Sequence, residues 1–313
     1  MSGGGATLPA HLVFGNLTID DTVFPDGSTA MGTMGGNAVY ATAGARLWTH
    51  SVAMVSRLGT GYPDRLLRDL ERAGLRTDGL IPSAHHHIRQ WQLYDVEGGR
   101  TYVPLRSSAT YADLTPAPDE IPARVCRGLR SAHVAPLRVD LQAALVEWLK
   151  ARGATVTLDP HFDSVAGEAG EAGAWAALLP SVDAFLPSRE EAEALLGCWP
   201  GPAEAAVALS RLGPAVVCVK LGAEGCVAYD ARDRRVWRLP SPARRVVDVT
   251  GCGDAFCGGF LVGWAASGDV ARGCALGSAA AAVVAGGYGA AHALACDPDE
   301  ARVHLDRIAV GEA

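Results

Sequence analysis

Short strand-like runs alternate with helical patterns from about residue 131 onward, and this alternation constrains the fold more than any other feature. The runs are apolar, and most are followed by a stretch with the apolar spacing of a helix. Strands and helices in this order form a mostly parallel sheet covered by helices. We expect strands at 132–135, 155–158, 184–186, 216–221 and 226–229, and helices at 141–151, 190–196 and 203–212.

Two segments of the first third break this rhythm. Residues 18–33 surround the turn signal Pro25-Asp26-Gly27, and residues 88–105 alternate apolar and polar residues around Glu97-Gly98-Gly99. Both patterns predict antiparallel hairpins. We therefore expect one α/β domain over residues 1–313 that carries a small β appendage. The remaining elements of the domain are expected to be strands at 11–14 and 52–56 and helices at 38–47, 64–73, 254–266, 270–285 and 298–308.

The composition of the 313-residue chain argues against several classes of function. A net charge of −7 disfavours general nucleic-acid binding, because phosphate contacts need a basic surface, and it disfavours anionic membranes. No apolar run reaches the ~20 residues that span a bilayer. The first ten residues lack the basic flank and apolar run of a signal peptide. The 8 cysteines form no C-x-x-C pair, so we expect reduced structural thiols and a cytoplasmic protein.

The stretch Asp248–Phe256 carries the most chemical information. Gly251 and Gly253 follow an apolar strand end and precede an apolar helix, so the backbone there can approach a ligand closely. The helix dipole favours an anion at this point, and Asp254 would lie beside it in the first turn. Such a carboxylate suits a reaction in which it accepts a proton from an attacking hydroxyl. A capping turn with an acidic first turn explains the bare spacing equally well.

The whole stretch resembles the Asp-x-Thr-Gly-Ala-Gly-Asp signature of the ribokinase-like (PfkB) carbohydrate kinase family, with Cys252 where Ala is usual. The resemblance extends along the chain. Gly35-Gly36-Asn37-Ala38 is similar to the family's first signature, and Asp20 matches the acidic residue that holds substrate hydroxyls. Gly61–Asp78 is similar to the helix and turn after the second strand. Lys220–Gly225 is similar to the Gly-x-x-Gly segment near the nucleotide.

The resemblance implies a ribokinase-like three-layer α/β sandwich with a mostly parallel central sheet and a small β lid, made of the two hairpins. It also implies a kinase that uses ATP and Mg²⁺ to phosphorylate a hydroxyl of a small sugar-like substrate. Asp254 would be the general base, and the amides of Gly251, Cys252 and Gly253 would be the anion hole. The implied binding residues are Asp20, Gly35, Gly36 and Asn37 for the substrate, Lys220, Gly222, Gly225, Thr250 and Gly287 for the nucleotide, and Glu191 and Asp248 for cations.

Several of these assignments have a purely structural alternative. Glu191 matches the family's magnesium-organising Glu, although Ser188 replaces the usual Asn, and the two residues also form the sequence of a helix capping box. Asp159 either neutralises an active-site cation or touches phosphates, or it belongs to an ordinary turn at the end of a strand. The run 85–87 of three histidines cannot easily converge on one ion, and we predict a solvated entry to the lid. Basic residues near the lid could meet an anionic substrate or stay solvated, namely Arg89, Arg100 and Arg106.

Other functions stay open on the sequence alone. A nucleoside or a cyclitol could replace the sugar, and a non-catalytic binding protein could keep the same fold. A dinucleotide-dependent oxidoreductase is disfavoured, because no Gly-x-Gly-x-x-Gly follows the first strand. The resemblance further implies that the backbone at Asp248 and Thr250, with the segment 286–290, can bind a monovalent cation such as K⁺. It also implies that two chains can pair through their lids.

Overall fold

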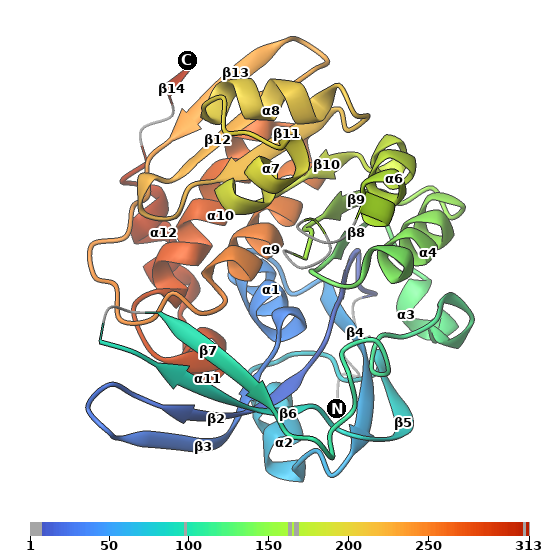
Figure 1. Ribbon diagram of the computed structural model, residues 1–313, viewed down its shortest axis with the longest axis vertical. Coiled ribbons are helices and arrows are strands. Elements are labelled where there is room, and N and C mark those ends of the chain that lie inside the picture. The colour runs from blue at the N-terminus through green and yellow to red at the C-terminus, as the bar shows by residue number, and fades with distance from the viewer. Residues whose placement is uncertain (1–7, 97–98, 162–164, 166–168, 309–310, 313) are drawn as a thin grey trace, which may run out of the picture.

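A ten-stranded sheet runs through the middle of the molecule in the computed structural model, which describes residues 8–96, 99–161, 165, 169–308 and 311–312 (Figure 1). Its strands are β1 (His11–Phe14), β4 (Val52–Thr60), β5 (Leu80–His86), β8 (Ser131–Val134), β9 (Thr155–Leu158), β10 (Ala184–Phe185), β11 (Val216–Lys220), β12 (Cys226–Asp230), β13 (Arg235–Leu239) and β14 (Gly311–Glu312). Their order is β14-β13-β12-β11-β10-β9-β8-β1-β4-β5. The seven strands from β5 to β11 are parallel, and the pairs beyond β11 are antiparallel.

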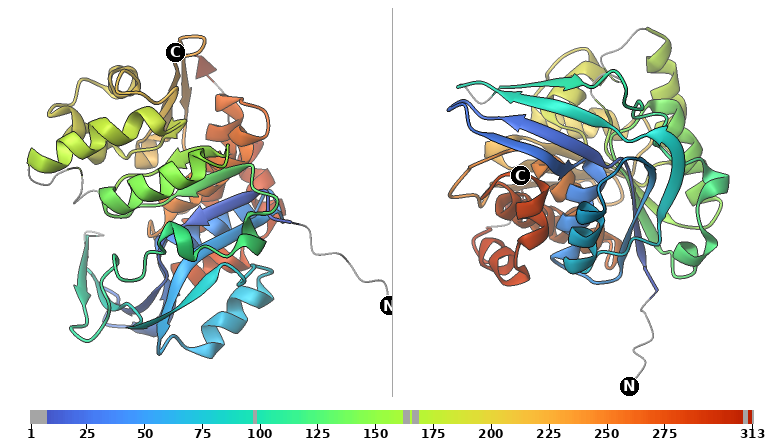
Figure 2. Two further views of the ribbon diagram at one scale, coloured as in Figure 1. Left: turned by 90° about the vertical axis from the view of Figure 1, so that its right-hand side faces the viewer. Right: turned by 90° about the horizontal axis from the view of Figure 1, so that it is seen from below.

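Helices cover both faces of this sheet, because its central strands are apolar on both sides. In β1, Leu12 and Phe14 face one helical layer, while Val13 faces the other. Figure 2 shows the two layers on opposite sides of the sheet. The first layer contains α3 (Ala123–Cys126), α4 (Val139–Lys150), α6 (Ala169–Leu178), α7 (Arg189–Leu196) and α8 (Pro202–Ser210). The second contains α1 (Asn37–Arg46), α2 (Asp64–Arg72), α9 (Cys252–Ala265), α10 (Val270–Val284), α11 (Gly289–Ala295) and α12 (Pro298–Leu305).

A second, four-stranded sheet forms the lid. Its strands are β2 (Thr18–Val23), β3 (Thr29–Gly35), β6 (Arg89–Tyr94) and β7 (Arg100–Pro104), in the order β3-β2-β6-β7. Each hairpin pairs internally in antiparallel fashion, and β2 joins β6 in parallel. The lid is therefore one sheet made from two distant parts of the chain, as Figure 1 shows below the main sheet.

The predicted three-layer α/β architecture and both lid hairpins are confirmed. Part of the second predicted turn, Glu97-Gly98, lies outside the described residues. Sequence reasoning did not predict β5, β13, β14, α3, α6 or α11, and the strand expected at 52–56 continues to Thr60. Short 3-10 helices complete the fold at η1 (Pro118–Glu120), η2 (Leu179–Ser181) and η3 (Gly222–Glu224).

The prediction of a solvated histidine run is wrong for His87. His85 and His86 are exposed at the end of β5, but His87 is only 4% exposed. Its Nδ1 accepts a 3.0 Å hydrogen bond from the Gly59 amide, and its ring packs edge-on against Tyr62. Burial lowers the pKa of His87 to about 4, so this ring is neutral and part of the packing beneath the lid.

None of the helices in the described part of the chain combines the length and the apolar character that crossing a membrane requires.

Candidate active site

A cavity of about 880 Å³ lies between the inner face of the lid and the sheet edge where α9 begins. One wall is formed by residues of the lid strands and the start of α1, including Asp20, Asn37, Gln90, Gln92 and Tyr102. The opposite wall includes Asp159, Thr250, Gly251, Gly253 and Asp254. The cavity therefore brings three of the predicted substrate residues, Asp20, Gly36 and Asn37, together with the predicted phosphate-binding motif, more than 200 residues away in sequence. Gly35, the fourth, does not line it in the described part of the chain.

The turn at 248–254, which we call the anion-hole turn, bends sharply because Gly251 adopts a left-handed conformation with φ of +74°. A Cβ atom at Gly251 would collide with the ring of Tyr40, so only glycine fits here. Gly251 caps α9, and the first amides of a helix have no intrahelical acceptor. The amide of Cys252 already donates to the Val249 carbonyl at 3.2 Å, within the turn.

Asp254 lies in the first turn of α9 and lines the cavity. Burial, together with the neighbouring charges of Asp159 and Glu191, raises the pKa of its carboxyl group to about 8 against the opposing effect of Lys220 and Arg100. The group therefore exchanges its proton near neutral pH, as a general base requires.

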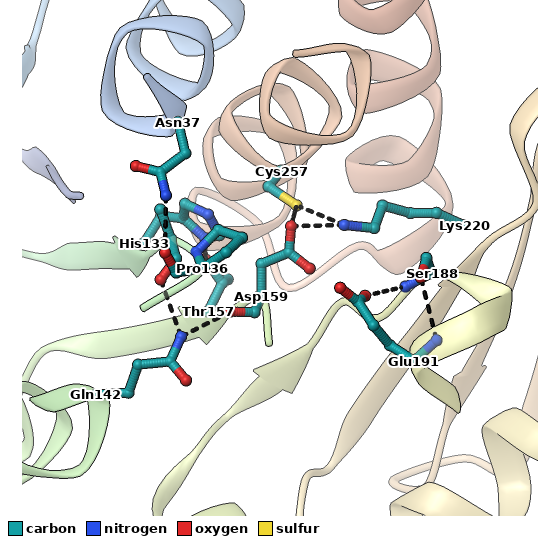
Figure 3. A network of polar contacts seen from close by, with 11 residues as sticks. Asn37, His133, Pro136, Gln142, Thr157, Asp159, Ser188, Glu191, Lys220 and Cys257 are labelled. Atoms are coloured by element: carbon teal, nitrogen blue, oxygen red, sulfur yellow. Dashed lines mark hydrogen bonds and ion pairs between the residues drawn. The ribbon is translucent and has the colours of Figure 1, made fainter. Parts of the chain in front are cut away.

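A buried ion pair stands beside this carboxylate at the ends of β9 and β11. The Nζ atom of Lys220 lies 2.5 Å from Asp159 Oδ2 and 3.7 Å from Cys257 Sγ (Figure 3). Burial opposes the charge of Lys220, but Asp159, Cys257 and Glu191 more than offset this, so the pKa of Lys220 lies above its usual value. Lys220 also borders the anion-hole turn, because a Cβ atom at Gly253 would lie 3.6 Å from its Nζ.

Glu191 and Ser188 form the capping box that begins α7. The Ser188 amide donates to Glu191 Oε2 at 2.7 Å, and the Glu191 amide donates to Ser188 Oγ at 3.2 Å. Figure 3 shows this pair beside Asp159 and Lys220. The capping box predicted from the sequence is therefore confirmed. It uses Oε2 of Glu191, and the other carboxylate oxygen of Glu191 takes no part in it.

The predicted substrate carboxylate, Asp20, is held rigidly by the lid. Its Oδ1 accepts hydrogen bonds from Thr18 Oγ1 at 2.8 Å and Gln90 Nε2 at 3.2 Å, and its Oδ2 accepts from Gln92 Nε2 at 2.7 Å. Burial raises the pKa of Asp20 to about 6. Gly35 packs directly against this carboxylate, where any side chain would collide with it.

Gly36 and Asn37 begin α1 at the floor of the cavity. Gly36 has a φ of +104° and packs against the backbone of Asn16. The side-chain oxygen of Asn37 accepts from the Asn16 amide at 2.8 Å, and its Nδ2 donates to the Pro136 carbonyl at 2.7 Å. Asn37 thus joins two loops that surround the cavity.

Asp248 organises the anion-hole turn from within. Its Oδ1 accepts hydrogen bonds from the amide of Thr250 at 2.9 Å and from the hydroxyl of Thr250 at 2.6 Å, and its Oδ2 accepts from the Gly289 amide at 3.3 Å. Gly287 packs against the ring of His292. Gly287 and Asp248 do not line the cavity in the described part of the chain. The predicted monovalent-cation site at this position stays a prediction.

Gly222 and Gly225 form the turn between β11 and β12, directly after Lys220. Both have positive φ, +57° and +95°, and a Cβ atom at Gly225 would collide with the Leu239 carbonyl. Among the described residues, this turn borders Lys220 and not the cavity itself.

Contacts between the lid and the anion-hole turn were not anticipated from the sequence. The Tyr94 hydroxyl donates to Asp248 Oδ1 at 2.9 Å and lies 2.5 Å from Thr250 Oγ1. Arg100 Nη1 donates to the same Thr250 hydroxyl at 2.5 Å. The strict alternation of the 88–105 segment was the only sequence signal, since it places Gln90, Gln92 and Tyr94 on one face.

Comparison with known proteins identifies the chain. The description "pfkB family carbohydrate kinase" belongs to the family model that matches residues 16–295. The chain is a member of this family. It is 30% identical to the cytidine kinase of Thermococcus kodakarensis over 258 residues, which cover 81% of this chain and 87% of that protein. It is therefore an enzyme of the sugar and nucleoside kinase class.

Solved structures show the same fold. A fructokinase of Xylella fastidiosa with bound ATP superposes with a TM-score of 0.78 at 22% identity, over 96% of this chain and 99% of that one. A ribokinase II of Escherichia coli in complex with ATP and Mg²⁺ also gives 0.78, at 19% identity, over 96% of this chain and 100% of the other. These likenesses show the ribokinase fold.

Proposed function

We propose that this chain transfers the γ-phosphoryl group of ATP to a hydroxyl group of a small sugar or nucleoside. One observation carries the proposal: Asp20, the anion-hole glycines and Asp254 line a single cavity under the lid. An acceptor held at the Asp20 wall would face a phosphate held at the opposite wall. Fructokinase and ribokinase II structures with bound ATP, and the cytidine kinase relative, support the choice of substrates.

The acceptor would bind through Asp20. A carboxylate offers about four acceptor positions, and three of them at Asp20 are occupied by Thr18, Gln90 and Gln92. The remaining position can accept a substrate hydroxyl. Because Asp20 and both glutamines belong to lid strands, β2 and β6, closure of the lid and capture of the acceptor would occur together.

Asp254 would act as the general base. It would take the proton of the acceptor hydroxyl as that oxygen attacks the γ-phosphorus, and with a pKa near 8 the ionised form that can do this becomes the major one only at alkaline pH. The glycine amides at the start of α9 and the charge of Lys220 would stabilise the phosphates. Tyr102 and the rest of the lid would keep water away from the reacting groups.

Magnesium fits the carboxylates next to this site. Asp159 Oδ1 is buried and has no hydrogen-bond partner among the described residues, and Glu191 raises the pKa of both Asp159 and Asp254. Such a cluster of oxygen ligands, only partly neutralised by Lys220, suits a hard divalent cation that keeps part of its water shell. Asp159 and Glu191 would hold the ion, which would neutralise charge on the phosphates of ATP.

The test is ADP release from ATP and Mg²⁺ across a panel of pentoses, hexoses, cyclitols and nucleosides. We expect one acceptor class to be phosphorylated, and Asp254→Asn to lower kcat by about 10²–10⁴. Asp119→Asn, at an exposed carboxylate, is the matched control and should keep the wild-type rate. A protein that binds ATP and turns over none of the panel would favour a binding function, and a fully active Asp254→Asn variant would remove Asp254 from its role.

A further inference from the structure

Arg100, the first residue of β7, extends from the lid to the anion-hole turn. Its guanidinium donates to the hydroxyl of Thr250, the residue before the first anion-hole glycine. It lines the cavity together with Gly251, Gly253 and Asp254. A cation on the lid sheet thus stands at the end of the cavity proposed to bind phosphate, away from the proposed acceptor carboxylate Asp20.

Arg100 differs from two other cationic side chains near the cavity, because those two form ion pairs with carboxylates. Lys220 is 2.5 Å from Asp159, and Arg138 is 2.6 Å from Asp140, so each of these cations is already paired with a carboxylate. Arg100 donates to a neutral hydroxyl, and no ion pair joins it to a carboxylate within the described part of the chain. A partly buried, permanently charged group without a paired anion is suited to receive one.

Two aromatic rings hold the guanidinium in place. The Cζ atom of Arg100 lies 6.0 Å from the ring centroid of Tyr94 and 5.9 Å from that of Tyr102. These contacts and the bond to Thr250 restrict the orientation of the side chain, while most of its five N–H donors remain for other acceptors. The planar fork of an arginine matches two oxygens of a phosphoryl group.

We propose that Arg100 is a catalytic residue that contacts the transferring phosphoryl group and neutralises the charge on its oxygens during transfer. This inference rests on the proposed kinase function. The acceptor oxygen forms a bond to the γ-phosphorus, the bond from that phosphorus to the bridging oxygen of ADP breaks, and the acceptor proton passes to Asp254. Arg100 keeps its own proton throughout. Because the arginine belongs to the lid, the site is complete only when the lid is closed.

The experiment compares Arg100→Gln and Arg100→Ala with wild type, using MgATP with cytidine, D-ribose and any better acceptor from the panel. We expect kcat to fall by about 10²–10³ in both variants, because one charge-stabilising donor is lost. The acceptor KM should change by less than about threefold, since the contact is made chiefly in the transition state. Added methylguanidinium should restore part of the rate of Arg100→Ala, which a purely structural role would not allow. Arg72→Gln, at an exposed arginine of α2 that does not line the cavity, is the matched control.

Two results would overturn the inference. One is a kcat for Arg100→Gln that lies within threefold of the wild-type kcat, measured with an acceptor that the wild type phosphorylates. The other is a raised KM for ATP with unchanged kcat, which would make Arg100 a binding residue only. A wild-type chain that phosphorylates no acceptor would instead contradict the proposed function itself, so the two failures are distinguishable.

Discussion

Replacing Asp254, the proposed general base, should make the unliganded protein more stable at alkaline pH. Asp254 sits in a site where ionisation is unfavourable, since burial and the charges of Asp159 and Glu191 all raise its pKa. An asparagine of the same shape keeps the packing and removes the charge. We therefore expect Asp254→Asn to lose phosphoryl transfer and to gain resistance to unfolding.

The size of the gain follows from the pKa. The carboxyl group titrates at 3.8 in the unfolded chain and at about 8 in the folded protein. Between these values the folded state keeps a proton that the unfolded state has released, so wild-type stability falls as pH rises through this window. At about 1.4 kcal/mol per pKa unit the upper limit is roughly 5–6 kcal/mol. Because Asp254 is partly exposed to the cavity, we expect about half of that, roughly 2–3 kcal/mol at pH 8.

The assay is thermal unfolding of both proteins at pH 5, 7 and 8.5 without nucleotide. For a chain of 313 residues this free energy corresponds to a rise in Tm of about 3–5 °C at pH 8.5. The difference should shrink to about 1 °C at pH 5, where the folded wild type still holds its proton. Asp119→Asn, at an exposed position, controls for the general effect of removing a negative charge.

A variant whose Tm exceeds that of wild type by the same amount at every pH would refute the reasoning, because the gain would then not come from ionisation. So would an Asp254→Asn protein that is less stable than wild type at pH 8.5.

Two further predictions concern the rate. Gly251→Ala should lower kcat by more than about 10²-fold, because the φ of +74° at Gly251 and the ring of Tyr40 exclude a side chain. The control is Gly268→Ala, which has a similar φ of +73° but lies away from the cavity, and it should leave kcat unchanged. With both substrates limiting, the rate should rise with pH up to the pKa of Asp254, about 8, and then level off. A rate that is flat from pH 6 to 9 would exclude this group as the base.

The sequence predicted those turns, hairpins and helix caps that depend only on residues close to one another in the chain. The Gly-x-Gly-Asp turn before an apolar helix, the two hairpin signals and the alternation of strands and helices each depend on neighbouring residues, and all of these elements are present. The same holds for the capping box of Ser188 and Glu191. Turn chemistry, capping and periodicity are short-range effects, which one sequence displays directly.

Features that depend on distant segments could not be predicted in this way. His87 looked solvated beside two other polar residues, but the neighbouring strand buries it under Tyr62. The pairing of Lys220 with Asp159 joins the ends of two parallel strands, and nothing in either segment selects the other. Gln92 supports Asp20 only because β6 runs parallel to β2, a connection across 70 residues. Such contacts depend on which strands lie side by side in the sheet, and the periodicity of a single sequence does not determine that order.

The two walls of the cavity also differ in where they come from along the chain. The side that would meet the acceptor is drawn mainly from residues before about 140. The side that would meet the phosphates comes from Asp159 onward, apart from Arg100, which reaches it from the lid. Mutations in the first part that spare Arg100 can therefore alter which hydroxyl compound is accepted without replacing the groups proposed to handle the phosphoryl transfer.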